Sequence, residues 1–181
     1  MKNTKQSYGG ITILLHWLVA VSVFGLFAVG FWMVELDYYS EWYKQAPALH
    51  KSFGLCLLFV MIFRVVWKFI QIKPDPIKTH KPIERKLGGL VHSFLYLLLF
   101  VIMFAGYFIS TADGRGIEVF GLFELPGFGS FVENQEDKAG VLHEYAAYLL
   151  MLVVILHAAA ALKHHFIDKD QTLLRMLGKN N

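Results

Sequence analysis

The chain has 181 residues and a formal net charge of +3, and its composition is too apolar for an ordinary soluble domain. Hydrophobic residues make up 56% of it and charged residues 17%, whereas a soluble globular domain is about 45 to 50% apolar. The composition therefore predicts an integral membrane protein.

Four apolar stretches are long enough to cross a bilayer. A hydrocarbon core about 30 Å thick needs about 20 helical residues at a rise of about 1.5 Å each. In chain order, the stretches that meet this length are about 11–34, 48–70, 87–109 and 141–162. Because these stretches and their connections use up residues 1–181, we expect one transmembrane domain with an all-α, four-helix-bundle fold.

The two longer connections differ in character. Residues 73–86 contain three prolines and many charges, which indicates an extended loop. Residues 110–138 mix glycine, proline and aromatic side chains, and their middle part reads IEVFGLFELPGF. That part is too short to cross a membrane, so we expect it to lie in the interface.

Basic residues gather on one side of the predicted bundle. With the N-terminus in the cytoplasm, four of the 17 Lys and Arg residues lie outside, namely Lys44, Lys51, Arg115 and Lys138, which leaves 13 inside. This asymmetry is the positive-inside pattern, and it predicts cytoplasmic N- and C-termini. The basic side then faces lipid headgroups, so the net charge gives no reason to expect a nucleic-acid partner.

Two histidines, His143 and His157, bracket the apolar run of the fourth stretch. An ionisable group at the centre of a span costs about 2.5 to 3.5 kcal/mol or more, so such a group normally has a function. The two positions are 14 residues apart, which is about 21 Å along a helix and about 40° short of four full turns. Both imidazoles therefore project from nearly the same helix face at two depths.

Each of these histidines has a partner at its own depth on another helix. His50 lies near the outer end of the second stretch, at the level of His143, and His16 lies near the inner end of the first, at the level of His157. Facing imidazoles in a bundle core are the ligands of b-type haem. Two such pairs predict two haems stacked across the bilayer.

The way in which the haems are held follows from the cysteine and glycine positions. Cys56 is the single cysteine, so the chain has no C-x-x-C-H haem attachment and any haem is bound non-covalently. We expect Cys56 to pack in the core. Gly54, one turn from His50, leaves room for a flat macrocycle.

Other histidines leave alternatives open. His92 lies at the depth of His16, so it could replace His16 as a ligand, or contact a haem propionate or a quinone. His80 is expected to be solvated in its loop, and His164 and His165 are expected to be interfacial. A haem-free transition-metal carrier is the alternative from another class, although the apolar stretch between the two depths offers a moving cation no carboxylate or thiolate.

Arg64 and Lys68 lie one turn apart near the inner end of the second stretch. Both could extend toward the lipid headgroups, as basic side chains at helix ends commonly do. Alternatively, the planar guanidinium of Arg64 binds a haem propionate.

Three segments resemble the bacterial cytochrome b-561 family: ITILLHWLVAV, LHKSFGLCLLFVMIFRVVWK and LHEYAAYLLMLVVILHAAAALKHHFIDKDQTLLRM. The likeness covers almost the whole chain in order. It implies a multi-pass protein of the bacterial inner membrane, with His16 and His157 on the inner haem and His50 and His143 on the outer. It also implies electron exchange with ubiquinone, and some members are similar to superoxide oxidases.

The sequence leaves open which molecule donates the electron. Basic groups near the outer haem would attract the superoxide anion over about 8 to 10 Å, and Lys51, Arg115 and Lys138 are the candidates, although pairing with neighbouring carboxylates is the alternative. The haems would carry the redox chemistry, so no residue is required as an acid, base or nucleophile. A cytochrome subunit of a hydrogenase- or dehydrogenase-type complex is the alternative function, although the sequence itself requires no protein partner.

Overall fold

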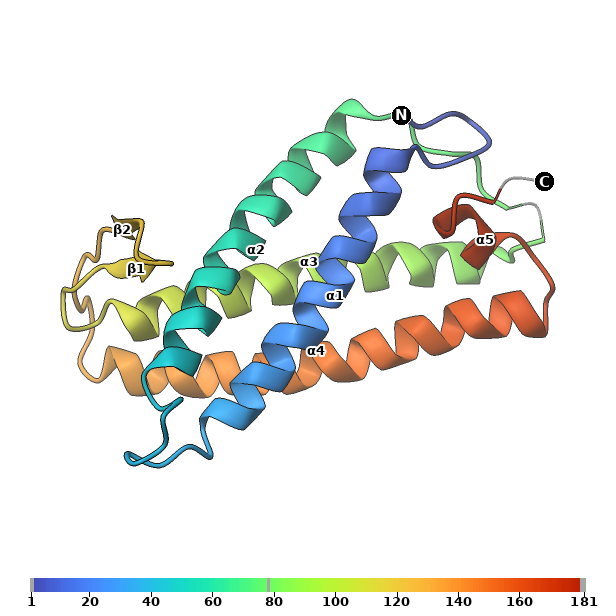
Figure 1. Ribbon diagram of the computed structural model, residues 1–181. Coiled ribbons are helices and arrows are strands. Elements are labelled where there is room, and N and C mark those ends of the chain that lie inside the picture. The colour runs from blue at the N-terminus through green and yellow to red at the C-terminus, as the bar shows by residue number, and fades with distance from the viewer. Residues whose placement is uncertain (1, 78, 180–181) are drawn as a thin grey trace.

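The computed structural model describes residues 2–77 and 79–179 and has the form of a bundle of long helices (Figure 1). The long helices are α1 (Gly10–Met33), α2 (Gln45–Ile70), α3 (Pro82–Ser110) and α4 (Gln135–Phe166). Within the described residues, these four are long and apolar enough to cross a membrane. Lys78, one of the basic residues assigned to the cytoplasmic side, lies outside the described residues.

Polar residues extend the helices beyond the apolar stretches. α3 begins with Pro82, whose fixed φ suits the first helical turn, and the backbone N–H of Lys81 donates to the Glu84 carboxylate at 2.8 Å. α4 begins at Gln135 and has Glu136 and Asp137 in its first turn, where negative charge is favourable to the helix dipole.

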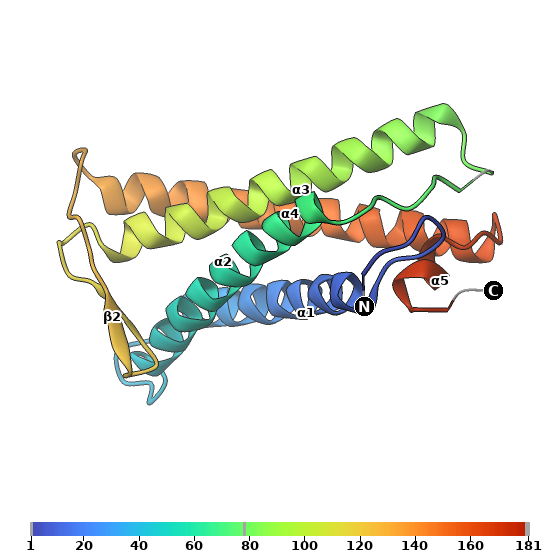
Figure 2. The same ribbon diagram turned by 90° about the horizontal axis from the view of Figure 1, so that it is seen from above.

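The four long helices form two antiparallel pairs. α1 packs along α2 and α3 along α4, with less contact between the two pairs. Figures 1 and 2 show the α1–α2 pair inclined across the α3–α4 pair. The segment before α1 and the short helix α5 (Thr172–Met176), which follows α4, lie at one end of the bundle, which we call the termini end. The opposite end carries a small β-hairpin, and we call it the hairpin end.

The buried core lies midway along the bundle and receives residues from all four long helices. It consists of Val19, Val23, Leu57, Met61, Leu98, Leu99, Ala146 and Leu150. On α4, Ala146 and Leu150 lie between His143 and His157, so the core separates the two histidine levels.

The outer surface of the helices is rich in large apolar side chains, as expected for contact with lipid. Exposed examples are Phe24, Phe31, Phe59, Phe63, Phe69, Leu152 and Ile155. Cys56 is also exposed, so the expectation that it packs in the core was wrong. Its position on α2 points outward because Leu55 and Leu57, on either side of it, are the residues that α2 buries here.

The connection between α3 and α4 contains a two-stranded antiparallel hairpin. Strand β1 (Ile117–Val119) pairs with β2 (Phe123–Leu125), so that Ile117 lies opposite Leu125. Ile117 and Val119 are buried against Leu55 of α2. We expected this segment to lie in the interface, and the strands within it were not predicted. The hairpin is indicated by the alternating triplets IEV and FEL, which lie on either side of a turn at Gly121. The φ of Gly121 is 72°.

Candidate functional site

His50 on α2 and His143 on α4 face each other at the hairpin end, with ring centroids 6.2 Å apart. Nδ1 of His143 lies 2.9 Å from the main-chain carbonyl oxygen of Ile102. Because a carbonyl oxygen only accepts, Nδ1 is the donor and Nε2 of His143 keeps its lone pair. Nδ1 of His50 is buried without a hydrogen-bond partner among the described residues.

Two glycines lie directly against these rings. A Cβ at Gly30 of α1 would lie 3.2 Å from Cε1 of His50, and a Cβ at Gly106 of α3 would lie 3.2 Å from Cε1 of His143. We expected Gly54 to have this role, but a Cβ there meets no atom of the described residues within 4 Å. The signal for Gly30 and Gly106 was their depth, since both fall toward the hairpin end of a long apolar helix.

A cavity of about 630 Å³ adjoins His50 and His143 and is lined by residues of all four long helices. Cofactor and ligand pockets of proteins span about 300 to 1,000 Å³ and are mostly apolar. The lining here is mainly apolar, with Lys51 and Glu144 among its few charged members. Size, lining and the ring nitrogens together fit a flat, apolar macrocycle that carries a metal.

Three histidines meet nearer the termini end. The ring centroids of His16 on α1 and His157 on α4 are 6.4 Å apart, and His92 on α3 is 5.0 Å from His157. An imidazole nitrogen binds a transition metal at about 2 Å, so two rings that face each other across one ion have centroids about 6 Å apart. The separation of His16 from His157 meets this requirement, and that of His92 is too short.

Arg64 lies between this histidine group and the ring of Tyr96. Nη2 of Arg64 lies 3.2 Å from Nδ1 of His16, and because a guanidinium only donates, Nδ1 of His16 accepts. The Arg64 guanidinium also lies 5.4 Å from the Tyr96 ring centroid, and Nζ of Lys68 lies 4.8 Å from it. The structure therefore brings Arg64, Lys68 and His16 close together, and it adds Tyr96, to which no distinct role was assigned from the sequence.

The three basic residues considered for attracting an anion lie in different surroundings. Lys51 lines the cavity beside His50. Nε of Arg115 donates to the Asp113 carboxylate at 2.6 Å, and this hydrogen bond lowers the pKa of Asp113. Nζ of Lys138 donates to the Glu133 carbonyl oxygen at 2.8 Å. Arg115 is thus compensated by a carboxylate, and Lys51 is the basic residue of the three that faces the cavity.

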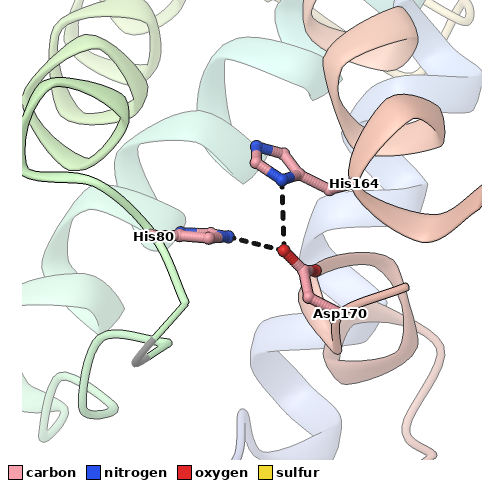
Figure 3. A group of neighbouring side chains, drawn as sticks. All are labelled: His80, His164 and Asp170. Carbon is pink, nitrogen blue, oxygen red and sulfur yellow. Dashed lines mark hydrogen bonds and ion pairs between the residues drawn. The ribbon is translucent and has the colours of Figure 1, made fainter. Parts of the chain in front are cut away.

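A further polar cluster at the termini end joins His80, His164 and Asp170 (Figure 3). Nε2 of His80 lies 2.8 Å from Oδ2 of Asp170, and the His80 side chain is 17% exposed. The expectation that His80 is solvated was therefore wrong, because the segment after α4 folds back and places Asp170 against it. Burial tends to raise the pKa of Asp170, but hydrogen bonds from Thr172 and His80 outweigh it and lower that pKa.

Long apolar helices with histidines paired at two depths beside an apolar cavity define the class of membrane cytochromes that bind b-type haem. A family model described as prokaryotic cytochrome b561 matches residues 7–179. The chain belongs to this family. It is therefore a multi-pass membrane protein of electron transport with b-type haem.

Known relatives agree with this assignment. The chain is 48% identical to cytochrome b561 homolog 2 of Escherichia coli (strain K12) over 179 residues, which cover 99% of this chain and 95% of that protein. It is 29% identical to the probable superoxide oxidase CybB of Yersinia pestis, over 96% of this chain and 97% of that protein. It is 30% identical to cytochrome b562 of Cereibacter sphaeroides, over 96% of each chain.

Proposed function

We propose that this cytochrome holds two b haems and moves single electrons across the membrane, from a donor at the hairpin end to ubiquinone at the termini end. The observation that carries the proposal is the separation of 6.2 Å for His50 and His143 and of 6.4 Å for His16 and His157, at two levels of one bundle. Bound haem supplies a reversible one-electron couple at its iron.

The polypeptide's part is to hold the ligands and exclude water. The Ile102 carbonyl fixes the tautomer of His143, which is a common outer-shell device for metal-binding histidines. Gly30 and Gly106 let the two imidazoles lie close to α1 and α3. The aliphatic core between the two levels keeps the site apolar, and the polarity around a haem tunes its potential.

At the termini end, the Arg64 guanidinium can act only as a hydrogen-bond donor. When a histidine binds a metal through Nε2, its Nδ1 carries the proton and has no lone pair for a second donor. Arg64 would then turn from His16 toward an anion, for which a haem propionate is the natural partner. His92 and Lys68, on the neighbouring surface, are our candidates for contact with a propionate or with the quinone.

The orientation proposed places the termini end in the cytoplasm, in the bacterial inner membrane. Basic residues concentrate at the termini end, whereas the hairpin-end loops are acidic. This distribution supports the orientation through the positive-inside rule. The whole chain then works as one transmembrane domain.

Superoxide is the donor that we propose for the hairpin end. Lys51 beside the cavity supplies positive charge there, and a long-range field of this kind raises the rate at which an anion arrives. The likeness to a protein named a probable superoxide oxidase supports the same donor. The proposed activity is therefore that of a superoxide:ubiquinone oxidoreductase.

The test begins with the detergent-purified protein, a reduced-minus-oxidised spectrum and a pyridine haemochrome assay. We expect two low-spin b haems per chain. Rapid mixing with enzymatically generated superoxide should then reduce the haems, which their absorbance spectrum follows. A ubiquinone analogue should reoxidise them, and superoxide dismutase should abolish the first step.

Each alternative outcome identifies a different function. Two haems without reaction toward superoxide would remove that donor and favour a cytochrome subunit of a hydrogenase- or dehydrogenase-type complex, which co-purification of a partner would reveal. A chain without haem, expressed with ample haem supply, would contradict the proposal and favour a transition-metal carrier.

A further inference from the structure

Three metal-binding side chains from separate segments converge at the termini end (Figure 3). His80 comes from the loop between α2 and α3, His164 from the last turns of α4, and Asp170 from the segment before α5. We propose that these three residues bind one divalent transition-metal ion, with Zn²⁺ the ion that suits them best. This site is separate from the haem ligands and goes beyond the electron-transfer function.

The distances between the ligand atoms suit a tetrahedral metal site. Oδ2 of Asp170 lies 2.8 Å from Nε2 of His80 and 3.1 Å from Nδ1 of His164. The three ligand atoms lie within 4.8 Å of one another. Metal bonds of about 2.0 to 2.1 Å in a tetrahedron put neighbouring ligands about 3.3 Å apart. An ion can therefore enter after only small side-chain movements.

Burial favours a built site over a solvated surface cluster. The side chain of Asp170 is 3% exposed and that of His164 is 14% exposed. Thr172 holds Asp170 in place, because its backbone N–H donates to Oδ1 at 2.8 Å. That contact leaves Oδ2 of Asp170 directed at the two imidazoles.

The hydrogen bonding of His164 gives an independent reason to expect a ligand. Its Nδ1 lies 2.8 Å from Oδ2 of Asp168 and 3.1 Å from Oδ2 of Asp170. Neither contact has the geometry of a hydrogen bond, so the buried Nδ1 has no hydrogen-bond partner among the described residues. A buried ring nitrogen next to carboxylates but without a hydrogen bond is costly, and a bound cation would satisfy it.

An overlapping group, Glu84, His164 and Asp168, is the less suitable choice. Nζ of Lys163 lies 2.6 Å from Oδ2 of Asp168 and 3.7 Å from Oε1 of Glu84. This ammonium already pairs with both carboxylates and would repel a second cation. Asp170 has no such lysine partner among the described contacts, so its carboxylate is the one available to a metal.

The donor types select the metal. Two imidazoles and one carboxylate are typical of Zn²⁺ sites, with water or the Thr172 hydroxyl as a fourth ligand. Ca²⁺ and Mg²⁺ prefer oxygen ligands throughout, and Cu⁺ prefers sulfur. Nε2 of His80 lies 3.1 Å from the Thr172 hydroxyl oxygen, so that oxygen is within reach of the same ion.

A metal here would connect segments that are distant in sequence. It would join the loop between α2 and α3 to the end of α4 and the segment before α5. α5 is itself held to α1, because Nε1 of Trp17 donates to the Met176 carbonyl oxygen at 2.8 Å. Zn²⁺ should therefore raise the thermal stability of the folded protein, since an ion that binds only the native state stabilises it.

The experiment is a Zn²⁺ titration of the full-length, haem-loaded protein in detergent, in competition with a chromogenic chelator. We expect one Zn²⁺ per chain, a rise in Tm, and a zinc-edge X-ray absorption spectrum with nitrogen and oxygen ligands that include imidazole. His80→Gln and Asp170→Asn should each weaken binding at least about tenfold, because each removes a ligand.

The matched control is His165→Gln, which removes the adjacent histidine of the same helix turn and should leave Zn²⁺ affinity unchanged. His80→Gln changes a loop residue, so it tests the site even if Asp170→Asn fails to fold. Absence of saturable binding, or equal loss in His165→Gln and His80→Gln, would overturn the proposal. The haem spectrum is read separately, so failure of this site and failure of the two-haem function are distinguishable.

Discussion

Nδ1 of His143 donates a hydrogen bond of 2.9 Å to the carbonyl oxygen of Ile102, which belongs to the neighbouring helix. This bond ties the ring of α4 to the backbone of α3 and leaves Nε2 as the free nitrogen. The arrangement depends on Gly106, because a Cβ there would lie 3.3 Å from the same Nδ1.

Gly106→Ala should therefore disturb the hairpin-end haem. The added methyl group pushes the His143 ring away from Ile102, so we expect partial loss of one of the two haems and a shifted spectrum for the remainder. The pyridine haemochrome assay and a low-temperature difference spectrum measure both effects. Gly25→Ala is the matched control, because a Cβ at Gly25 meets no atom within 4 Å in the part of the chain that the structure describes. Equal haem content in the two variants would speak against the close fit.

Separate substitutions of His16 and His92 distinguish the two possible haem ligands at the termini end. We expect His16→Gln to leave one haem per chain and His92→Gln to retain two, since centroids 6.4 Å apart admit an ion between His16 and His157 and the 5.0 Å from His92 to His157 does not. Haem content and the electron paramagnetic resonance signals of the oxidised protein measure this. The reverse result would make His92 the ligand.

Loss of the Arg64 charge should lower the midpoint potential of the termini-end haem. A cation nearby stabilises the state that has gained an electron, so Arg64→Gln should shift the potential down by about 20 to 60 mV, or roughly 0.5 to 1.4 kcal/mol of charge interaction. Lys68→Gln removes the same charge from an exposed position and should shift it less. A redox titration of both variants tests this, and equal potentials in wild type and Arg64→Gln would refute it.

Lys51→Gln should slow the reaction with superoxide at low ionic strength by a factor of about 2 to 10 and reduce its dependence on salt. The reason is the loss of positive charge at the cavity that Lys51 lines. Lys138→Gln makes the same change of charge at a residue directed to the Glu133 carbonyl and should have little effect. Rapid-mixing rates at several salt concentrations decide between local and general electrostatic attraction.

Ser52 anchors the β-hairpin to α2. Its buried hydroxyl accepts from the Phe120 N–H at 3.1 Å and donates to the Ala48 carbonyl at 2.9 Å. Ser52→Ala leaves the Phe120 N–H without a partner, which should lower the free energy of unfolding by about 1 to 3 kcal/mol. Ser93→Ala removes a similar helix-backbone hydrogen bond at an exposed position and should cost less than about 0.5 kcal/mol. Thermal unfolding and proteolysis of the hairpin measure the difference.

The sequence was sufficient to predict the four apolar helices and the two depths of His143 and His157 on the last of them, because both depend on short-range regularities. Apolar length defines a span, and the helical repeat places His143 and His157 on one face. The family assignment is confirmed by the match over residues 7–179. The ligand roles of the histidines remain predictions, although the structure brings each proposed pair together.

The features that the sequence analysis missed depend on how distant segments meet. His80 and Asp170 are 90 positions apart, and only the return of the chain after α4 brings them together. Likewise, helical spacing cannot tell which glycine a ring will contact, because that depends on how closely two helices approach. The depth of Gly30 and Gly106 could be inferred from the sequence, but their contact with the rings required the three-dimensional structure.

The aliphatic core between the two histidine levels has an electrical consequence. Its side chains, among them the fully buried Met61, neither accept nor release protons, so on the function proposed above an electron would cross this layer without an accompanying proton. An inward electron would then move negative charge against an inside-negative voltage. Full passage of one electron across the membrane costs about 2.3 kcal/mol per 100 mV. A membrane potential that is negative inside should therefore slow the electron transfer, and removal of that potential should raise its rate.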